Sequence, residues 1–150
     1  MTSSLFVVTE IPAPLGGMAF PTPQTDWRAL HERGFRHVVR LHPAAYDPAP
    51  LEAHDVALED LHGGLTPRDA TAEEQRVWEA AELTAAYLRQ REGVVVHCVG
   101  GTGRTGTVVA CSLRLLGRSA DEAIDAVRAH RPQWPESRWQ DDVVRDRPLD

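Results

Sequence analysis

The 150-residue sequence predicts one α/β domain, residues 1–150, with a small central sheet covered by helices. Strand-like apolar runs fall in the first two-thirds of the chain, and helical patterns dominate the last third. One β-branched run, Val94–His97, leads directly into a glycine-rich loop, as a central strand does in α/β proteins. The length and the 42% hydrophobic content suit a single buried core.

The first part of the chain is expected to form short strands around one helix. Three segments have the composition of strands: Leu5–Val8, Phe35–Leu41 and His54–Leu58. The Pro/Gly-rich stretch Ile11–Pro23 is expected to be a connection. The helix begins after Thr25 or Asp26, either of which can cap it, and ends before Gly34.

Helices dominate the rest of the chain. Two residue pairs have the spacing of a capping box, which opens a helix: Thr71 with Glu74, and Ser119 with Glu122. The helix that starts near Thr71 is expected to end before Gly93. The remaining helices are expected over Thr105–Leu116, Ser119–His130 and Pro135–Val144.

Charge and composition limit the classes of partner. The net charge of −6 and the pI of about 5.6 do not favour nucleic acid or an anionic membrane. The amino terminus has no basic region typical of a secretory signal, and two cysteines make no disulfide framework. We therefore expect a cytoplasmic monomer. All 16 basic residues are arginine, and lysine and asparagine are absent, as in proteins encoded by GC-rich bacterial genomes.

The loop in VVVHCVGGTGRTGT, residues 94–107, permits two chemistries. Gly101, Gly103 and Gly106 match G-x-G-x-x-G, the fingerprint of a dinucleotide-binding turn. That unit also needs a second strand ending in a carboxylate, whereas here the helix after the loop is followed by another helix. A nucleotide-binding loop of the G-x-x-x-x-G-K-[ST] type needs a lysine, which this chain lacks.

The cysteine in the same loop explains more of its residues. Cys98 directly follows the strand, and the next backbone N–H groups wrap toward a helix N-terminus, where they can form an anion nest. Those dipoles and the Arg104 guanidinium would favour the thiolate and hold three phosphoryl oxygens. Thr105 follows as a hydroxyl donor to the sulfur. The expected phosphate cradle is Val99, Gly100, Gly101, Thr102, Gly103 and Arg104.

These nine residues, His97–Thr105, resemble the protein tyrosine phosphatase signature His-Cys-x5-Arg-Ser/Thr. GFRHVVRL resembles the strand after the first helix of compact dual-specificity-type phosphatases. RPQWPESRWQ resembles the family segment Arg-Pro followed by Glu-Ser/Thr-x-x-Gln. The resemblance covers residues 26–144, and it implies a mixed sheet with helices on both sides.

The resemblance also implies roles for single residues. Cys98 would attack phosphorus, Arg104 would bind the equatorial oxygens, and His97 would support the geometry around the cysteine. Gln140 would position the hydrolytic water, with a surface glutamine as the alternative. No cofactor or metal is implied. The other histidines show no metal-ligand spacing and are expected to be solvated or structural: His31, His37, His42, His54, His62 and His130.

The family's general acid is an aspartate on a separate loop before the central strand. Asp60 and Asp69 are the candidates. Asp60 is favoured because glycines at 63 and 64 let its loop bend over the pocket, whereas Asp69 precedes a helix, where an acid complements the helix dipole.

We therefore predict a cysteine-dependent phosphatase acting on phosphotyrosine and on phosphoserine or phosphothreonine, in proteins or in small phosphate esters. Two alternatives remain at this point. The first is a phosphoprotein-binding module on the same fold, and the second is a dinucleotide-binding oxidoreductase.

Overall fold

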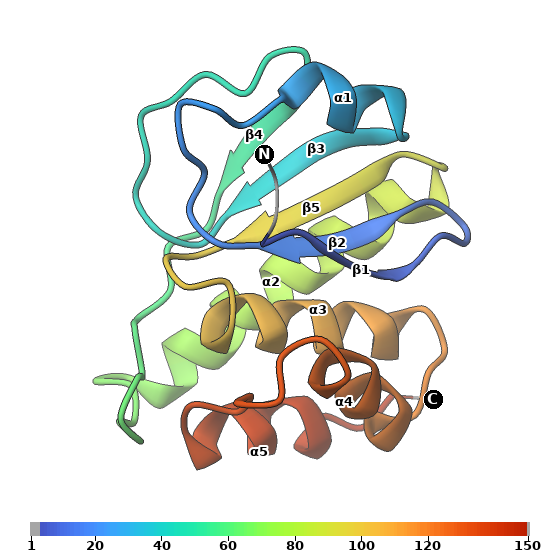
Figure 1. Ribbon diagram of the computed structural model, residues 1–150. Coiled ribbons are helices and arrows are strands. Elements are labelled where there is room, and N and C mark those ends of the chain that lie inside the picture. The colour runs from blue at the N-terminus through green and yellow to red at the C-terminus, as the bar shows by residue number, and fades with distance from the viewer. Residues whose placement is uncertain (1–3, 150) are drawn as a thin grey trace.

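Five strands form a single sheet in the order β1-β2-β5-β3-β4 (Figure 1). The computed structural model describes residues 4–149. The strands are β1 (Phe6–Thr9), β2 (Leu15–Met18), β3 (Phe35–Arg40), β4 (Glu52–Asp55) and β5 (Gly93–His97). Strand β1 is antiparallel to β2, and every other neighbouring pair is parallel. The sheet is therefore mixed, as expected, and the carboxyl ends of four strands meet at one edge.

Helices cover both faces of this sheet, which confirms the predicted architecture. Figure 1 shows α1 on one face and the other four helices on the opposite face. The helices are α1 (Trp27–Glu32), α2 (Ala70–Arg89), α3 (Gly103–Leu115), α4 (Ala120–Arg128) and α5 (Arg138–Asp146). No helix of residues 4–149 is long and apolar enough to span a bilayer.

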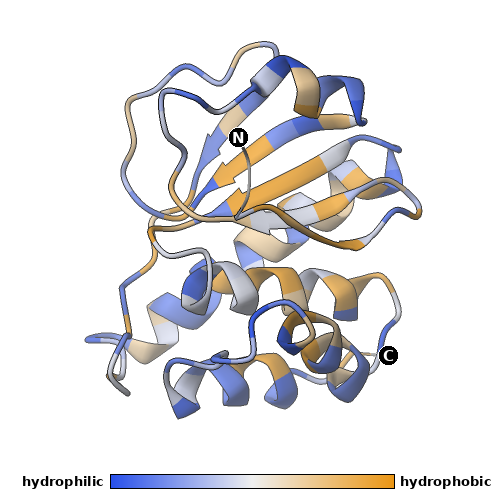
Figure 2. Cartoon of the chain, viewed as in Figure 1, coloured by the Kyte–Doolittle hydropathy of each residue, from blue (hydrophilic) through white to orange (hydrophobic). Residues whose placement is uncertain are grey.

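The central strand β5 is buried on both faces, which explains its continuous apolar sequence. Val94 and Val96 belong to the larger core beneath α2 and α3, whereas Val95 packs with Val38 in the smaller core beneath α1. Figure 2 shows β5 as a largely hydrophobic strand in the middle of the sheet. A strand buried on both faces needs no polar alternation.

Strand β2 lies inside Ile11–Pro23, so the prediction of a plain connection there is wrong. The strand contains Gly16 and Gly17, which have low β-propensity. A Cβ atom on Gly16 would lie 2.6 Å from the Phe6 carbonyl oxygen, and one on Gly17 would lie 2.6 Å from Cγ2 of Thr105. Close packing therefore requires the glycines that hide this strand from a propensity argument.

Two boundary predictions are also corrected. Strand β4 spans Glu52–Asp55 rather than His54–Leu58. Asp69 caps α2 by accepting a hydrogen bond from the Ala72 backbone N–H at 3.1 Å, so Thr71 and Glu74 form no capping box. The side chain before a helix bonds the free N–H groups of its first turn. Here Asp69 takes that role, so α2 begins at Ala70, before Thr71.

Two of the remaining helix starts agree with the sequence prediction, and one does not. Asp26, rather than Thr25, caps α1, and the predicted capping box of Ser119 with Glu122 is present at α4. The last helix begins at Arg138 rather than Pro135, because Ser137 accepts from the Gln140 N–H.

Candidate active site

The loop between β5 and α3 holds Cys98 beside a hydroxyl group. Cys98 follows the last residue of β5 and is 3% exposed. The Thr105 hydroxyl, on the first turn of α3, donates to Cys98 Sγ at 3.1 Å. A hydrogen bond donated to sulfur stabilises its thiolate more than its thiol, so Thr105 can support both attack and departure of the sulfur.

The loop is fixed to strand β2 through Gly101. This residue has φ = +76°, and a Cβ on it would lie 2.6 Å from the backbone nitrogen of Ala19. Its carbonyl accepts from Arg131 Nε at 3.0 Å. Arg131 also stacks over the Phe6 ring, with its guanidinium carbon 4.4 Å from the centroid. Residues near the amino terminus and in the carboxyl-terminal segment therefore hold the loop in its shape.

The other glycines of the G-x-G-x-x-G pattern also have packing roles. A Cβ on Gly103 would collide with the Glu136 carboxylate, and one on Gly106 would lie 2.5 Å from Cδ1 of Trp134. Trp134 Nε1 donates to the Gly103 carbonyl at 3.2 Å. Contacts with the chain's own carboxyl-terminal segment thus account for these glycines, and a dinucleotide is not needed to explain them.

Arg104 is positioned by two acceptors at the carboxyl edge of the sheet. Its Nη1 donates to the Leu58 carbonyl and contacts His42 Nδ1, both at 3.2 Å. A guanidinium group only donates, so His42 Nδ1 accepts and the His42 proton lies on Nε2. Arg104 is 6% exposed, and its side chain is held against the cavity that Cys98 also lines.

His97 is buried and bonded at both ring nitrogens. Its Nδ1 lies 3.0 Å from the Cys98 carbonyl, and its Nε2 lies 2.6 Å from the Tyr46 hydroxyl. Burial lowers the pKa of His97 despite the opposing hydrogen bond to the carbonyl, and burial raises the pKa of Tyr46. Neutral His97 therefore donates from Nδ1 to the Cys98 backbone carbonyl and accepts from the Tyr46 hydroxyl at Nε2. Both bonds are compatible with the predicted role of His97 in holding the backbone around the cysteine.

Asp60 and Cys98 line the same cavity, whose volume is about 250 Å³. Asp60 is exposed, and its Oδ1 accepts from the His62 backbone N–H at 3.0 Å. Asp69, the other candidate acid, is instead the cap of α2. The lining residues of the cavity are Asp60, His62, Cys98, Val99, Gly100, Thr102, Gly103, Arg104 and Glu136.

The loop that carries Asp60 is held on two sides. The backbone N–H of Glu59 donates to the carboxylate of Glu73, a buried residue of α2, at 2.7 Å. The Gly64 N–H donates to the Glu136 carbonyl at 3.0 Å, and His62 Nδ1 lies 3.3 Å from Glu136 Oε2. These contacts fix the Asp60 loop relative to the cysteine loop.

Gln140 is buried, so the surface-glutamine alternative is wrong. It is 2% exposed, and its Oε1 accepts from the Glu136 N–H at 2.8 Å. Its Nε2 lies 3.0 Å from the position that a Cβ on Gly103 would take. Gln140 is thus beside the loop, and its role in placing water remains a prediction.

Sequence reasoning missed four residues that build the site. Tyr46 and His42 could not have been found, because they lie in an irregular segment and reach the site through hydrogen bonds to partners distant in sequence. Arg131 and Glu136 lie in the RPQWPESRWQ segment that supported the resemblance, so that segment held an available signal.

A thiol at the start and a guanidinium at the end of one glycine-rich loop are typical of cysteine-dependent phosphate-handling domains. Comparison with known proteins agrees. Residues 16–118 match the family model described as "Polymorphic toxin system, DSP-PTPase phosphatase" (Tc-R-P). The chain belongs to this dual-specificity-type branch of the protein tyrosine phosphatase superfamily, whose members are phosphoric monoester hydrolases.

Relatives and solved structures lie in the same superfamily. Protein tyrosine phosphatase type IVA 2 of Mus musculus is 31% identical over 106 residues, 68% of this chain and 60% of the relative. Dual specificity protein phosphatase CDC14C of Homo sapiens is 32% identical over 118 residues, 74% of this chain and 24% of the relative. The chain thus spans less than two-thirds of these relatives.

Solved structures match along nearly the whole chain. The structure of Tk-PTP in its active form superposes with a TM-score of 0.72 at 26% identity, covering 96% of this chain and 95% of that one. A kinase associated phosphatase with its catalytic cysteine replaced by serine gives 0.70 at 21% identity, covering 94% and 90%. The second likeness supports the fold alone.

The two neighbouring loop glycines allow a matched test of the loop shape. Gly101→Ala should destabilise the protein by more than about 1–2 kcal/mol, because a left-handed residue gains a Cβ that also collides with the end of β2. Gly100→Ala meets no atom within 4 Å and should leave stability near wild type. Urea denaturation measures both variants, and equal stabilities would contradict this account.

Tyr46→Phe removes the donor to His97 Nε2 and leaves a buried acceptor without its partner. We expect a loss of about 1–3 kcal/mol in the free energy of unfolding. Tyr87→Phe is the control, because it deletes the other tyrosine hydroxyl of the chain away from His97. Chemical denaturation of the two variants side by side should show the larger loss in Tyr46→Phe, and the reverse order would refute a stabilising role of the Tyr46–His97 hydrogen bond.

The two thiols should differ in reactivity. Cys111 is fully buried in α3, and burial raises its pKa, so its thiolate is scarce and shielded. Cys98 lines the open cavity. Iodoacetamide should therefore add one group to the native protein and none to Cys98→Ser, as counted by intact mass. Labelling of native Cys98→Ser would show that Cys111 is accessible.

Proposed function

We propose that this chain hydrolyses phosphate monoesters through a cysteinyl-phosphate intermediate. The observation that carries the proposal is the convergence of Cys98, Arg104 and Asp60 on one cavity of about 250 Å³. These side chains supply a nucleophile, an oxyanion ligand and a proton donor, which are the three groups that phosphoryl transfer to a thiolate needs.

In the first step, the Cys98 thiolate attacks phosphorus while the bond to the leaving oxygen breaks. Protonated Asp60 gives its proton to that oxygen, so the alcohol or phenol leaves neutral. The loop N–H groups and Arg104 bind the three equatorial oxygens, and they bind best when negative charge is spread over them in the transition state. Asp60 becomes a carboxylate as the thiophosphate forms.

In the second step, water hydrolyses the thiophosphate. The Asp60 carboxylate accepts a proton from the water as its oxygen attacks phosphorus, and the S–P bond breaks. The departing sulfur recovers its negative charge, which the Thr105 hydroxyl stabilises through the bond seen at 3.1 Å. Inorganic phosphate leaves, and Asp60 is protonated again for the next cycle. Gln140, buried beside Gly103, is proposed to order the water through its loop contacts.

The rim of the cavity favours an aromatic phosphoester. Val99 lines the cavity and is 48% exposed. An aryl ring bound there would bury this apolar surface, whereas a serine or threonine side chain would leave it exposed to water. We therefore propose phosphotyrosine as the preferred substrate, with phosphoserine and phosphothreonine turned over more slowly. The loop before Arg104 has no basic side chain for a polyphosphorylated ligand.

Substitution of the proposed nucleophile and acid tests the mechanism with an aryl phosphate. Cys98→Ser should reduce turnover to background. Asp60→Asn should lower kcat by about 10²–10⁴-fold, and the loss should shrink for leaving groups of low pKa, which need no proton. Asp69→Asn is the matched control, because asparagine caps a helix as well as aspartate does.

Two outcomes would overturn these assignments. Full activity of Cys98→Ser would exclude the cysteinyl-phosphate. A leaving-group-dependent loss in Asp69→Asn, with Asp60→Asn near wild type, would move the acid to Asp69. A wild-type protein that binds a phosphotyrosine peptide in calorimetry without releasing phosphate would instead be a binding module.

A further inference from the structure

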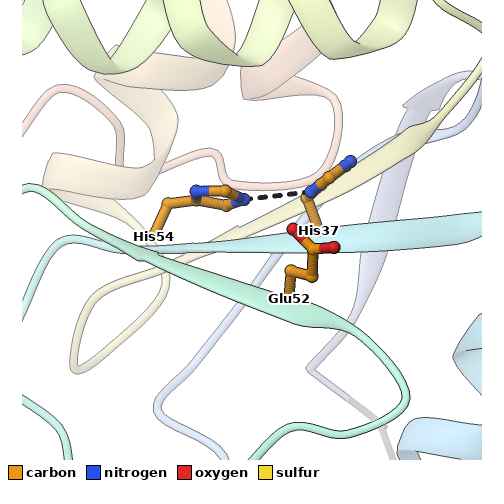
Figure 3. A group of neighbouring side chains, drawn as sticks. All are labelled: His37, Glu52 and His54. Carbon is orange, nitrogen blue, oxygen red and sulfur yellow. Dashed lines mark hydrogen bonds between the residues drawn. The ribbon is translucent and has the colours of Figure 1, made fainter.

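A cluster of potential metal ligands lies on strands β3 and β4, outside the cysteine cavity. His37 pairs with Glu52 in the parallel register of these strands, and Val39 pairs with His54. Alternate residues of a strand share a face, so all three side chains emerge on the same side of the sheet. Figure 3 shows the two imidazoles end to end, with the Glu52 carboxylate beside His37.

The ligand atoms of this cluster are close enough to share one ion. His37 Nδ1 and His54 Nε2 are 2.9 Å apart, and one ring nitrogen of each histidine lies within 4.8 Å of a Glu52 carboxylate oxygen. Zn–N bonds of about 2.0–2.1 Å place two tetrahedral nitrogen ligands roughly 3.3 Å apart. The histidines therefore need only a small separation, and the exposed Glu52 side chain can rotate to close the third bond.

The surroundings of His37 orient it as a ligand. Its other nitrogen, Nε2, lies 2.6 Å from Glu92 Oε1, and a carboxylate can only accept, so Nε2 carries the proton. In the neutral ring the Nδ1 lone pair then faces His54. The Tyr87 ring stacks on His37 at 3.5 Å between centroids, and His37 is 4% exposed. This carboxylate–histidine pairing is the outer-shell arrangement that fixes the tautomer of metal-bound histidines.

We propose that His37, Glu52 and His54 form a binding site for a divalent transition ion, with Zn²⁺ as the best match. Two imidazoles and one carboxylate suit this borderline ion and leave a fourth position for water. Binding requires the His54 proton to move from Nε2 to Nδ1, so that both facing nitrogens offer lone pairs, and no proton is released.

The position of the site suggests what the ion does. It joins the edge strand β4 to β3, and the chain after β4 reaches Leu58, whose carbonyl holds Arg104. An ion there stabilises the edge of the sheet without entering the hydrolysis reaction. Sequence spacing did not reveal it, because His37 and His54 are 17 residues apart and are brought together only by strand pairing.

Calorimetry with Zn²⁺ on metal-stripped, untagged protein tests the site. The experiment uses the Cys98→Ser background, because a thiolate binds zinc strongly by itself. We expect one ion per chain and a melting temperature that rises with Zn²⁺ concentration. Adding His54→Gln should weaken binding more than about 100-fold, and Glu92→Ala about 10–100-fold through loss of the outer-shell carboxylate.

Controls and a second readout separate this site from others. His31→Gln, on the opposite face of the sheet, should leave the isotherm unchanged. With Co²⁺, the Cys98→Ser protein should show visible d–d bands without a thiolate charge-transfer band. The proposal would be overturned if the protein bound no zinc. It would also be overturned if His54→Gln and Glu52→Gln bound zinc as tightly as the Cys98→Ser parent. Phosphatase activity is independent of this result, since His54→Gln with a chelator should keep wild-type turnover.

Discussion

The burial of β5 between β2 and β3 is the constraint on which the rest of the structure depends. Backbone hydrogen bonds on both edges of this strand leave it no freedom to shift, so the residue after it, Cys98, has a fixed position. The bonds continue past the strand end, where the Leu41 N–H donates to the His97 carbonyl and the Phe20 N–H to the Val99 carbonyl. The sulfur therefore sits in a frame made of three neighbouring strands.

Around that frame, the site is assembled from segments that are distant in sequence but end at the same sheet edge. The β3 end supplies His42 for Arg104, the β4 end supplies Leu58 and then the Asp60 loop, and the carboxyl-terminal segment supplies Arg131 and Glu136. Parallel strands make this possible, because their carboxyl ends coincide and the loops beyond them converge. Each supporting group bonds to backbone or to another side chain, so the loop is held by groups from several segments of the chain.

The sequence predicted the centre of the candidate site, although it predicted some of the strands wrongly. The central strand, the glycine loop and Arg104 follow one another along the chain, so their meaning is local and could be inferred directly. Strand β2 was not predicted, because its glycines are required by close packing against Phe6 and Thr105. An argument from β-propensity cannot include such contacts. Helix α2 was assigned the wrong cap because two acceptable capping patterns lie two residues apart, and only the folded backbone selects one.

By itself, therefore, the sequence determined the class of fold, the family, and the proposed nucleophile with its arginine, because these depend on residues adjacent in the chain. The tertiary structure showed that Asp60, and not Asp69, lines the cavity with Cys98, that Gln140 is buried, and that His37 meets His54. Those facts depend on strand register and on the packing of segments far apart in the chain. Such contacts arise only when the whole core closes, and no local pattern of residues encodes them separately.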